Sequence, residues 1–455
     1  MSSSDLSDQM LIPATSSRHG LAKTQVDWTS HNVYACLVCG KYYQGRGSNT
    51  HAHTHSVTQN HHVFINLGTK KFYCLPDCYE IIDSSLQDIL DLLDPLYTPQ
   101  SINALNTITV KARARDGSRY LPGIIGLNNI KKNDYMNVVV QALTQITDLR
   151  DFFLSSENTK NLKEPLAVRT GELFRKVWSS HHYRPHVSPH ELCQAIVNTS
   201  NKRFTITKQS FAVDFMAWYL NTLNTQLSKA KHKPSRSTIV SDCFQGIMEV
   251  TERRLRASEL LNDEVLQERA ALAEKDTKTD FSVKKRDMPF MFLTLDVPPA
   301  PLFTDAEGAN VIPQIPLYTL FEKFNGTTEQ SRDGKGFIYK IKQLPRYLIV
   351  YIKRFTKNNF FLEKNPTIVN FPVKNLDLKD FVGDKYTSET RYDLVANIVR
   401  DGPPDRGSYR VHVLHKGRGQ GTDSWFQIED LIISNILPQV ITLSEAYLQI
   451  YQLRT

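Results

Sequence analysis

The chain has 455 residues, of which 40% are hydrophobic and 22% charged, and its formal net charge is +8. This length allows about two or three domains. The composition excludes a wholly disordered chain, a collagen and a small disulfide scaffold. No apolar run reaches the roughly 20 residues that a membrane helix needs, so no membrane partner is expected. The positive charge fits a nucleic-acid-rich setting, but many plain enzymes carry a similar excess.

Residues 1–20 are rich in serine and other polar residues and show no periodicity, so they are expected to form a disordered tail. They lack the basic start and apolar core of a secretory signal. A reducing compartment is therefore expected, where closely spaced cysteines serve as metal ligands more often than as disulfides.

Residues 21–98 combine cysteines and histidines at the spacing of a metal site. Four of the six cysteines and half of the 14 histidines occur within the first 78 residues. Cys36 and Cys39 form a Cys-x2-Cys knuckle, which can hold one tetrahedral zinc together with two downstream histidines. The candidates for these two ligands are His51, His55, His61 and His62. Cys74 and Cys78 lack a second pair at zinc spacing, so they are either further ligands or buried hydrophobes.

The chain changes character after this cluster. A helix that Pro95 ends is predicted from apolar residues at helical spacing, which are Ile82, Leu86, Leu90 and Leu93. Residues 99–120 are polar and basic and are expected to be a linker, whereas residues 121–455 form one large body of helices and strands. One helical face near its start is formed by Met136, Val139, Val140, Leu143 and Ile146. Strand-like runs fill its later half, at residues 288–297, 346–355, 392–399 and 409–415.

The sequence words CLVCG, GRG, HAHTH and FYC within residues 36–74 resemble the ubiquitin-binding (UBP-type) zinc finger of several deubiquitinases. In that family the Cys-x2-Cys pair shares its zinc with the second histidine of an HAxxH element and with a histidine six residues on. The resemblance therefore implies one structural zinc, with the ligands Cys36, Cys39, His55 and His61. Arg46 keeps the position of an arginine that helps hold the ubiquitin C-terminus. Gly47 replaces the aromatic residue that usually follows, which puts ubiquitin binding in doubt.

The segment from Gly126 to Asn137, GLNNIKKNDYMN, resembles the cysteine box of ubiquitin-specific proteases. In active members a cysteine at the start of a helix has its thiolate stabilised by the helix terminus and acts as the nucleophile. That position is Asp134 here, and the usual glycine three residues earlier is Lys131. An aspartate is a poor nucleophile for an isopeptide bond, but it is expected to cap the helix by accepting first-turn amide hydrogens. Asn129 is retained, and the resemblance implies that it would help hold an oxyanion.

The C-terminal box departs from the protease pattern in the same way. Active members carry Gly-His-Tyr on a strand and then a Trp followed by Phe-Asp-Asp, whereas this chain has Ser408 for the base histidine and Glu429 for the orienting aspartate. His412 lies four residues further along the strand, roughly 13 Å away, so it cannot replace the base and is expected to be structural. The paired cysteines of the family's fingers region are missing, with only Cys243 nearby, so no zinc is expected there.

These motifs appear in order over residues 21–455. They imply an α+β chain in which a small UBP-type zinc finger (residues 21–98) precedes an inactive, papain-like ubiquitin-specific-protease fold of palm, thumb and fingers (residues 121–455). A finger followed by a protease-like domain without its cysteine and histidine resembles the spliceosomal proteins of the Sad family. That resemblance implies a nuclear, non-enzymatic scaffold that assembles or stabilises the tri-snRNP in pre-mRNA splicing.

The implied partners are tri-snRNP proteins, including the RNA helicase of that particle, with incidental contact to small nuclear RNA. Two alternatives stay open at this point. One is an active deubiquitinase that uses unconventional residues, and the other is a protein that binds RNA through its basic surface. Loss of both nucleophile and base argues against the first. Lack of an aromatic-basic recognition motif argues against the second.

Overall fold

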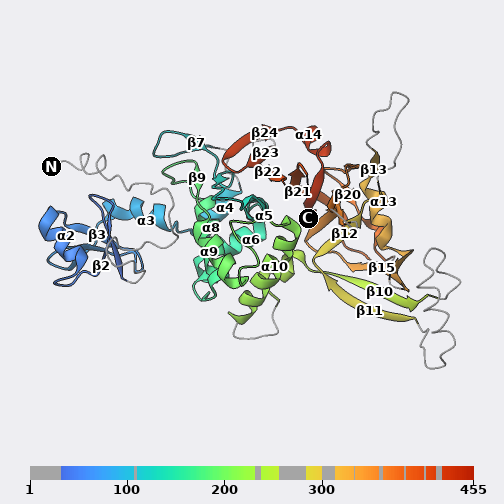
Figure 1. Cartoon of the computed structure of the whole chain (residues 1–455), viewed down its shortest axis with the longest axis horizontal. Coiled ribbons are helices and arrows are strands. Elements are labelled where there is room, and N and C mark those ends of the chain that lie inside the picture. The colour runs from blue at the N-terminus through green and yellow to red at the C-terminus, as the bar shows by residue number, and fades with distance from the viewer. Residues whose placement is uncertain are drawn as a thin grey trace.

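A computed structural model describes residues 32–106, 110–230, 237–255, 283–299, 313–332, 334–357, 362–383, 386–403, 406–416 and 423–454. The predicted disordered tail, residues 1–20, lies outside these ranges. Along its longest axis the chain passes from a small N-terminal domain through a group of helices to a large sheet, from which a second sheet projects (Figure 1).

The N-terminal domain, residues 32–93, is built on an antiparallel sheet with the strand order β2-β1-β3-β4-β5. Its elements are β1 (Val33–Cys36), β2 (Tyr42–Gln44), α2 (His51–Gln59), β3 (Val63–Asn66), β4 (Phe72–Cys74), β5 (Tyr79–Ile81), η1 (Ser84–Leu86) and α3 (Gln87–Leu93). Alternate residues of β1 face two separate cores, since Tyr34 packs with residues of α2 and Ala35 packs with residues of α3. Both cores are small, and domains of this size usually need a further cross-link.

The helix predicted from Ile82 onward begins later than expected. η1 and α3 follow Asp83, whose carboxylate accepts a hydrogen bond from the backbone amide of Ser85 at 2.8 Å. Ile82 precedes this turn and is 92% exposed, so it takes no part in the apolar face. Leu86 is buried against the N-terminal sheet together with Ile89.

The prediction of a linker over residues 99–120 is wrong for the residues that the structure describes there. α4 (Pro99–Leu105) starts with a capping box, in which the Thr98 hydroxyl accepts a hydrogen bond from the Ser101 amide. Ile102 and Leu105 are buried in the core of the large body. Two apolar side chains one turn apart are enough to dock a short helix, although the average composition of the segment is polar. The short strands β6 (Ala112–Arg113) and β7 (Arg119–Tyr120) then pair with each other.

A group of helices forms the first part of the large body, and within it α5 lies on the side next to the large sheet (Figure 1). The helices are α5 (Asp134–Thr144), α6 (Thr147–Leu154), α7 (Ser156–Thr159), α8 (Pro165–Val177), α9 (His190–Thr199), α10 (Ala212–Lys229) and α11 (Ile239–Phe244). Every residue of α5 is buried, so the predicted helical face is part of a helix enclosed on all sides. The strands β8 (Gly126–Leu127) and β9 (His186–Val187) pair beside it.

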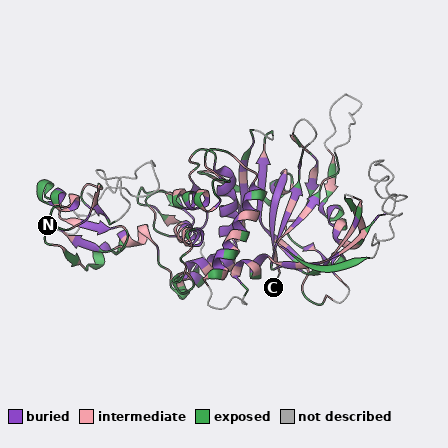
Figure 2. Cartoon of the chain, turned by 60° about the horizontal axis from the view of Figure 1, so that its bottom comes forward, coloured by how far each residue is buried: buried purple, intermediate pink, exposed green. Residues whose placement is uncertain are grey.

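The large sheet is mostly antiparallel, and its strands follow the order β12-β16-β25-β21-β22-β23-β24, with β20 also paired to β21. We call this sheet the palm. Its strands are β12 (Phe292–Asp296), β16 (Tyr347–Lys353), β20 (Leu376–Asp377), β21 (Arg391–Asp401), β22 (Ser408–His415), β23 (Ser424–Glu429), β24 (Ile432–Ile436) and β25 (Ala446–Leu453). The predicted strand runs are confirmed. Neighbouring residues of β16 face opposite cores, because Ile349 packs with the helices and Val350 packs on the other side. Figure 2 shows this sheet and the helices as the most buried part of the chain.

A second antiparallel sheet, β11-β10-β15-β14, projects from the palm (Figure 1). Its strands are β10 (Gly246–Arg254), β11 (Lys284–Phe290), β14 (Asn325–Arg332) and β15 (Lys335–Gln343). The remaining elements are β13 (Gln314–Pro316), α13 (Leu317–Phe321), η3 (Glu322–Phe324), β17 (Phe355–Lys357), β18 (Leu362–Lys364), β19 (Ile368–Asn370), η4 (Lys379–Phe381) and α14 (Pro438–Thr442). Cys243 is a buried free thiol in α11. Among the described helices, none has the length and apolar character needed to cross a bilayer.

Candidate functional site

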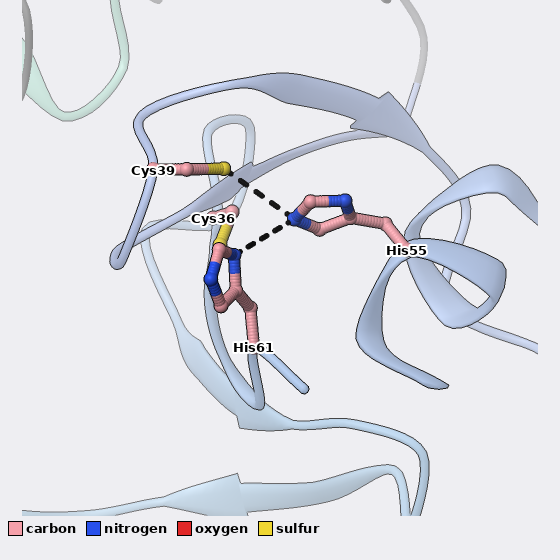
Figure 3. Close-up of side chains that lie close together, drawn as sticks. All are labelled: Cys36, Cys39, His55 and His61. Atoms are coloured by element: carbon pink, nitrogen blue, oxygen red, sulfur yellow. Dashed lines mark hydrogen bonds between the residues drawn. The ribbon is translucent and has the colours of Figure 1, made fainter. Parts of the chain in front are cut away.

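Four side chains of the N-terminal domain converge on one point (Figure 3). Cys36 ends β1, Cys39 lies in the following turn, His55 lies on α2, and His61 precedes β3. The knuckle is shaped by the backbone, because the Gly40 amide donates to the Cys36 carbonyl at 2.9 Å. The ligand atoms of all four side chains lie within 4.8 Å of one another. The structure therefore brings together the four residues that the family resemblance implied as ligands.

The spacing of these atoms fits a tetrahedral zinc ion. The Cys39 Sγ lies 3.4 Å from the His55 Nε2, which lies 3.2 Å from the His61 Nδ1. Zinc–sulfur bonds of about 2.3 Å and zinc–nitrogen bonds of about 2.0 Å give tetrahedral edges of roughly 3.3–3.8 Å. Burial raises the pKa of the Cys36 thiol to about 11. A bound dication would offset this effect, because it stabilises the deprotonated thiolate. Burial and the nearby His61 lower the pKa of His55.

The other cysteines and histidines of this domain lie outside the cluster. Cys78 donates its thiol hydrogen to the backbone carbonyl of Arg46 at 3.1 Å. The Nδ1 of His62 lies 2.8 Å from the carbonyl of Leu75. Cys74, in β4, does not contribute to the described cluster either. Of the four histidines that the spacing left open, His55 and His61 lie in the described cluster, and these are the two that the family resemblance implied.

Arg46 packs against an aromatic ring rather than standing alone. Its guanidinium carbon lies 4.1 Å from the centre of the Tyr73 ring. A side chain at the neighbouring Gly47 would meet no atom within 4 Å of its Cβ. The missing aromatic residue at Gly47 therefore leaves open space, and the doubt about ubiquitin binding stays a prediction.

The large body holds a second cluster, around the residues that the motif resemblance implied for a protease centre. Asp134 begins α5 and is buried. Its Oδ2 accepts hydrogen bonds from the Gln209 side-chain amide at 2.6 Å and from the Tyr409 backbone amide at 3.2 Å. The expectation that Asp134 caps its own helix is therefore wrong. It is the first residue inside the helix, after the N-cap Asn133, and its carboxylate reaches sideways to the start of β22.

Ser408 and Asn129 border the same centre. Ser408 begins β22 next to Tyr409 and is exposed, so it stands beside the Asp134 carboxylate but outside its hydrogen bonds. The Asn129 amide donates to the Asp430 Oδ2 at 3.0 Å. Burial raises the pKa of Asp430, and the Asp134 charge adds to this effect.

The position predicted from the motif for the orienting acid is Glu429, at the end of β23. The hydrogen bonds of the described residues join Asp430 to Asn129 and leave Glu429 out. Asp430 has a positive φ of 51°, which turns the chain after β23 and carries its side chain toward the centre. A one-residue shift of this kind depends on the turn and was not evident from the motif.

Gln209 is the residue that sequence reasoning missed. Its amide joins the Asp134 carboxylate to the backbone carbonyl of Gly407, at 2.6 and 2.9 Å. A signal for it exists in the sequence, because residues 210–223 resemble a helix that in ubiquitin-specific proteases usually reads Gln-x-Asp-Ala-x-Glu-Phe. When Ala212 and Phe215 are aligned with that pattern, its first glutamine corresponds to Gln209. Together these bonds join α5, β22 and the segment before α10 around the Asp134 carboxylate. Among the described residues, the two groups that donate to this carboxylate are amides, and neither is a histidine.

Asp134→Ala is expected to lower the free energy of unfolding by about 1.5–3 kcal/mol, because two hydrogen bonds to a buried carboxylate are lost. Urea unfolding of the full chain would measure this. Gln209→Ala is the partner variant, and the double variant should cost less than the sum of the two, since both remove the same bond. An Asp134→Ala protein more stable than the unmodified chain would show that Asp134 is a strained relic.

His412 is a buried structural residue, as expected. Its Nδ1 lies 3.1 Å from the Asn397 amide nitrogen and its Nε2 lies 3.2 Å from the Gln427 Oε1. Burial lowers its pKa to about 4, against the opposing hydrogen bond to Gln427. Burial also lowers the pKa of His182 to about 4. Neither pKa suits a general base that must work near pH 7.

The unfolding free energy is expected to fall as the pH drops from about 6.5 toward 4. An unfolded histidine takes up its proton near pH 6.5, whereas His412 in the folded chain stays neutral until about pH 4. One such group gives a slope of about 1.4 kcal/mol per pH unit in that window. His412→Gln should reduce the slope by about this amount, as measured by urea unfolding between pH 7 and 4.5. An unchanged slope would mean that His412 is protonated in the folded chain.

Comparison with known proteins agrees with this architecture. Residues 125–451 match the family described as ubiquitin carboxyl-terminal hydrolase, and residues 24–86 match the zinc finger found in ubiquitin hydrolases and other proteins. The chain is 50% identical to ubiquitin carboxyl-terminal hydrolase 39 of Homo sapiens over 437 residues, which cover 93% of this chain and 75% of that protein. It is 36% identical to the probable mRNA-splicing protein ubp10 of Schizosaccharomyces pombe, over 94% of this chain and 84% of that protein.

The fold is also found in a solved structure. The crystal structure of an essential yeast splicing factor superposes with a TM-score of 0.74 and 23% identity, and the match covers 96% of each chain. The expected fold class, an α+β chain with a UBP-type finger before a ubiquitin-specific-protease fold, is confirmed.

Proposed function

The chain belongs to the ubiquitin carboxyl-terminal hydrolase family, and from this membership we propose that it is a non-catalytic member that acts as a scaffold in pre-mRNA splicing. One observation carries the loss of catalysis. The nucleophile position is Asp134, whose carboxylate is bound to Gln209 and to the Tyr409 amide, and the base position is Ser408. Acyl transfer needs an activated nucleophile beside a base, and an oxyanion donor such as Asn129 cannot supply either.

The role in splicing is supported by the relatives. A relative 36% identical over most of both chains is named as a probable mRNA-splicing protein. A structure that matches over 96% of both chains is that of a yeast splicing factor. We place this chain in the nucleus, with proteins of the tri-snRNP as partners, including the RNA helicase of that particle. Contact with small nuclear RNA would be incidental.

The N-terminal domain would hold one structural zinc through Cys36, Cys39, His55 and His61. The support is the convergence of the four ligand atoms and their tetrahedral spacing. A zinc ion there would cross-link β1, the knuckle, α2 and the start of β3, and so would fix a domain whose two cores are small.

Affinity purification from nuclear extract tests the scaffold role. The tagged full chain is expected to recover the proteins and small nuclear RNAs of the tri-snRNP. An Asp134→Ala variant that still folds should recover these proteins and RNAs equally well, because we do not expect residue 134 to lie on the binding surface. Recovery of ubiquitin conjugates without spliceosomal components would contradict the proposal.

A further inference from the structure

The stretch Leu431–Leu443, with the sequence LIISNILPQVITL, has no charged residue, although 22% of the chain is charged. It comprises the turn after β23, the strand β24 and the helix α14. Five of its large apolar side chains are exposed, which are Leu431, Ile432, Leu437, Val440 and Leu443. Single exposed apolar residues are ordinary on a protein surface, but a group of this kind marks an interaction site. We call this stretch the apolar margin.

β24 is also the last strand of the palm sheet (Figure 1). It pairs with β23 on one side, from Ile432 opposite Glu429 to Ile436 opposite Trp425. Within the described residues no strand pairs with its other side. An edge strand with a free side presents backbone amide and carbonyl groups that can pair with another strand.

β11, an outer strand of the projecting sheet, carries residues that oppose pairing with a further strand. β11 carries Lys284, Lys285 and Arg286 and also contains Pro289. Charged residues and proline on an edge strand oppose addition of a further strand. β24 contains no charged residue and no proline, and its first residue, Ile432, is 72% exposed. The two edges therefore differ in the property that decides whether a strand can be added.

We propose that the apolar margin binds an extended, uncharged and apolar segment of another protein, which adds as a strand to β24. This rests on the proposed scaffold function and identifies a surface through which it would act. The absence of charge on the margin fits an uncharged partner, because an acidic or basic segment would bury charges without a counter-ion. A phosphate-bearing partner such as RNA is disfavoured for the same reason, since the margin offers no lysine or arginine.

Site-specific photo-crosslinking in nuclear extract tests the proposal. The full chain would carry p-benzoylphenylalanine in place of Ile432, and a control protein would carry it in place of Ile82, which is also an exposed isoleucine. The peptide crosslinked at residue 432 is expected to be an uncharged apolar segment of another protein. The Ile82 control should not yield this peptide.

A synthetic copy of the crosslinked peptide then gives the affinity. Fluorescence anisotropy with the purified full chain should show saturable binding that weakens at least tenfold in Ile432→Lys and in Leu437→Lys. Ile82→Lys should bind as the unmodified chain does. Thermal melts would verify that all three variants remain folded, as expected for exposed positions.

Three positive results in these experiments would overturn the proposal. These are crosslinks at residue 432 to a second copy of this chain, crosslinks to RNA or to a charged segment, and a peptide affinity unchanged by both lysine variants. Absence of any crosslink would overturn it as well if the chain still co-purifies with spliceosomal components, and the scaffold function would then stand. Failure to co-purify would instead contradict the scaffold function itself.

Discussion

Replacing Cys39 with alanine is expected to unfold the N-terminal domain while the large body stays folded. Structural zinc sites contribute about 10–16 kcal/mol to the folding of small fingers, which exceeds what two small cores supply. Cys39 contributes one of the four converging ligand atoms, and three remaining ligands would leave the ion open to water. Chelation of the metal from the unmodified full chain should have the same effect.

Metal analysis and limited proteolysis would measure this result. The unmodified chain should contain one zinc per molecule, and Cys39→Ala should contain almost none. Protease should then cut within residues 32–93 faster than in the unmodified chain, while cleavage elsewhere stays the same. Cys74→Ala is the matched control, because Cys74 lies in the same sheet outside the cluster, and it should keep its zinc. Purified chain without zinc would contradict the assignment of the site.

The full chain is expected not to cleave a ubiquitin–fluorophore substrate, and Asp134→Cys alone should remain at background. Nucleophile and base act as a unit, and loss of either alone costs on the order of 10⁶ in kcat in a hydrolase where this was dissected. A thiol at residue 134 would stand at the start of α5, but Ser408 cannot take up its proton. Any gain is therefore expected only when Ser408→His is added to Asp134→Cys.

Each variant must be shown to be folded before its activity is compared with that of the unmodified chain. Asp134→Cys also removes the bonds to Gln209 and to the Tyr409 amide, so urea unfolding must show that the variants stay native under assay conditions. Turnover by the unmodified chain that disappears in Asp134→Ala would revive the unconventional deubiquitinase. Turnover by Asp134→Cys alone would mean that another group serves as the base.

The Cys-x2-Cys spacing together with the family resemblance predicted which four side chains converge, and apolar runs predicted four strands of the palm, which are β12, β16, β21 and β22. Cys36, Cys39, His55 and His61 lie within 26 residues of one another, so the turn after β1 and the short helix α2 bring them together. These strands follow from short apolar runs rich in β-branched and aromatic residues, which favour buried strands. Asp134 and Ser408 were predicted to be degenerate catalytic positions because the family's motifs occur in the same order along this chain.

Tertiary structure decided the contacts that these side chains make. Asp134 binds Gln209 and Tyr409, which are 75 and 275 positions away along the chain, and no local pattern specifies a partner at such separations. Asp430 rather than Glu429 reaches Asn129, because the turn after β23 directs its side chain. Local patterns report which elements form and which face is apolar, whereas the neighbours of a polar side chain depend on how distant elements pack.

The exposure of the apolar margin was likewise decided by the tertiary structure. Its residues would suit a buried strand and helix by composition, and Ile441 within it is in fact buried. Ile432 begins β24, the outermost strand of its sheet, and its side chain is 72% exposed. The order of strands in a sheet is set by the packing of the whole domain, so the sequence of β24 alone could not show that no described strand pairs with one of its sides.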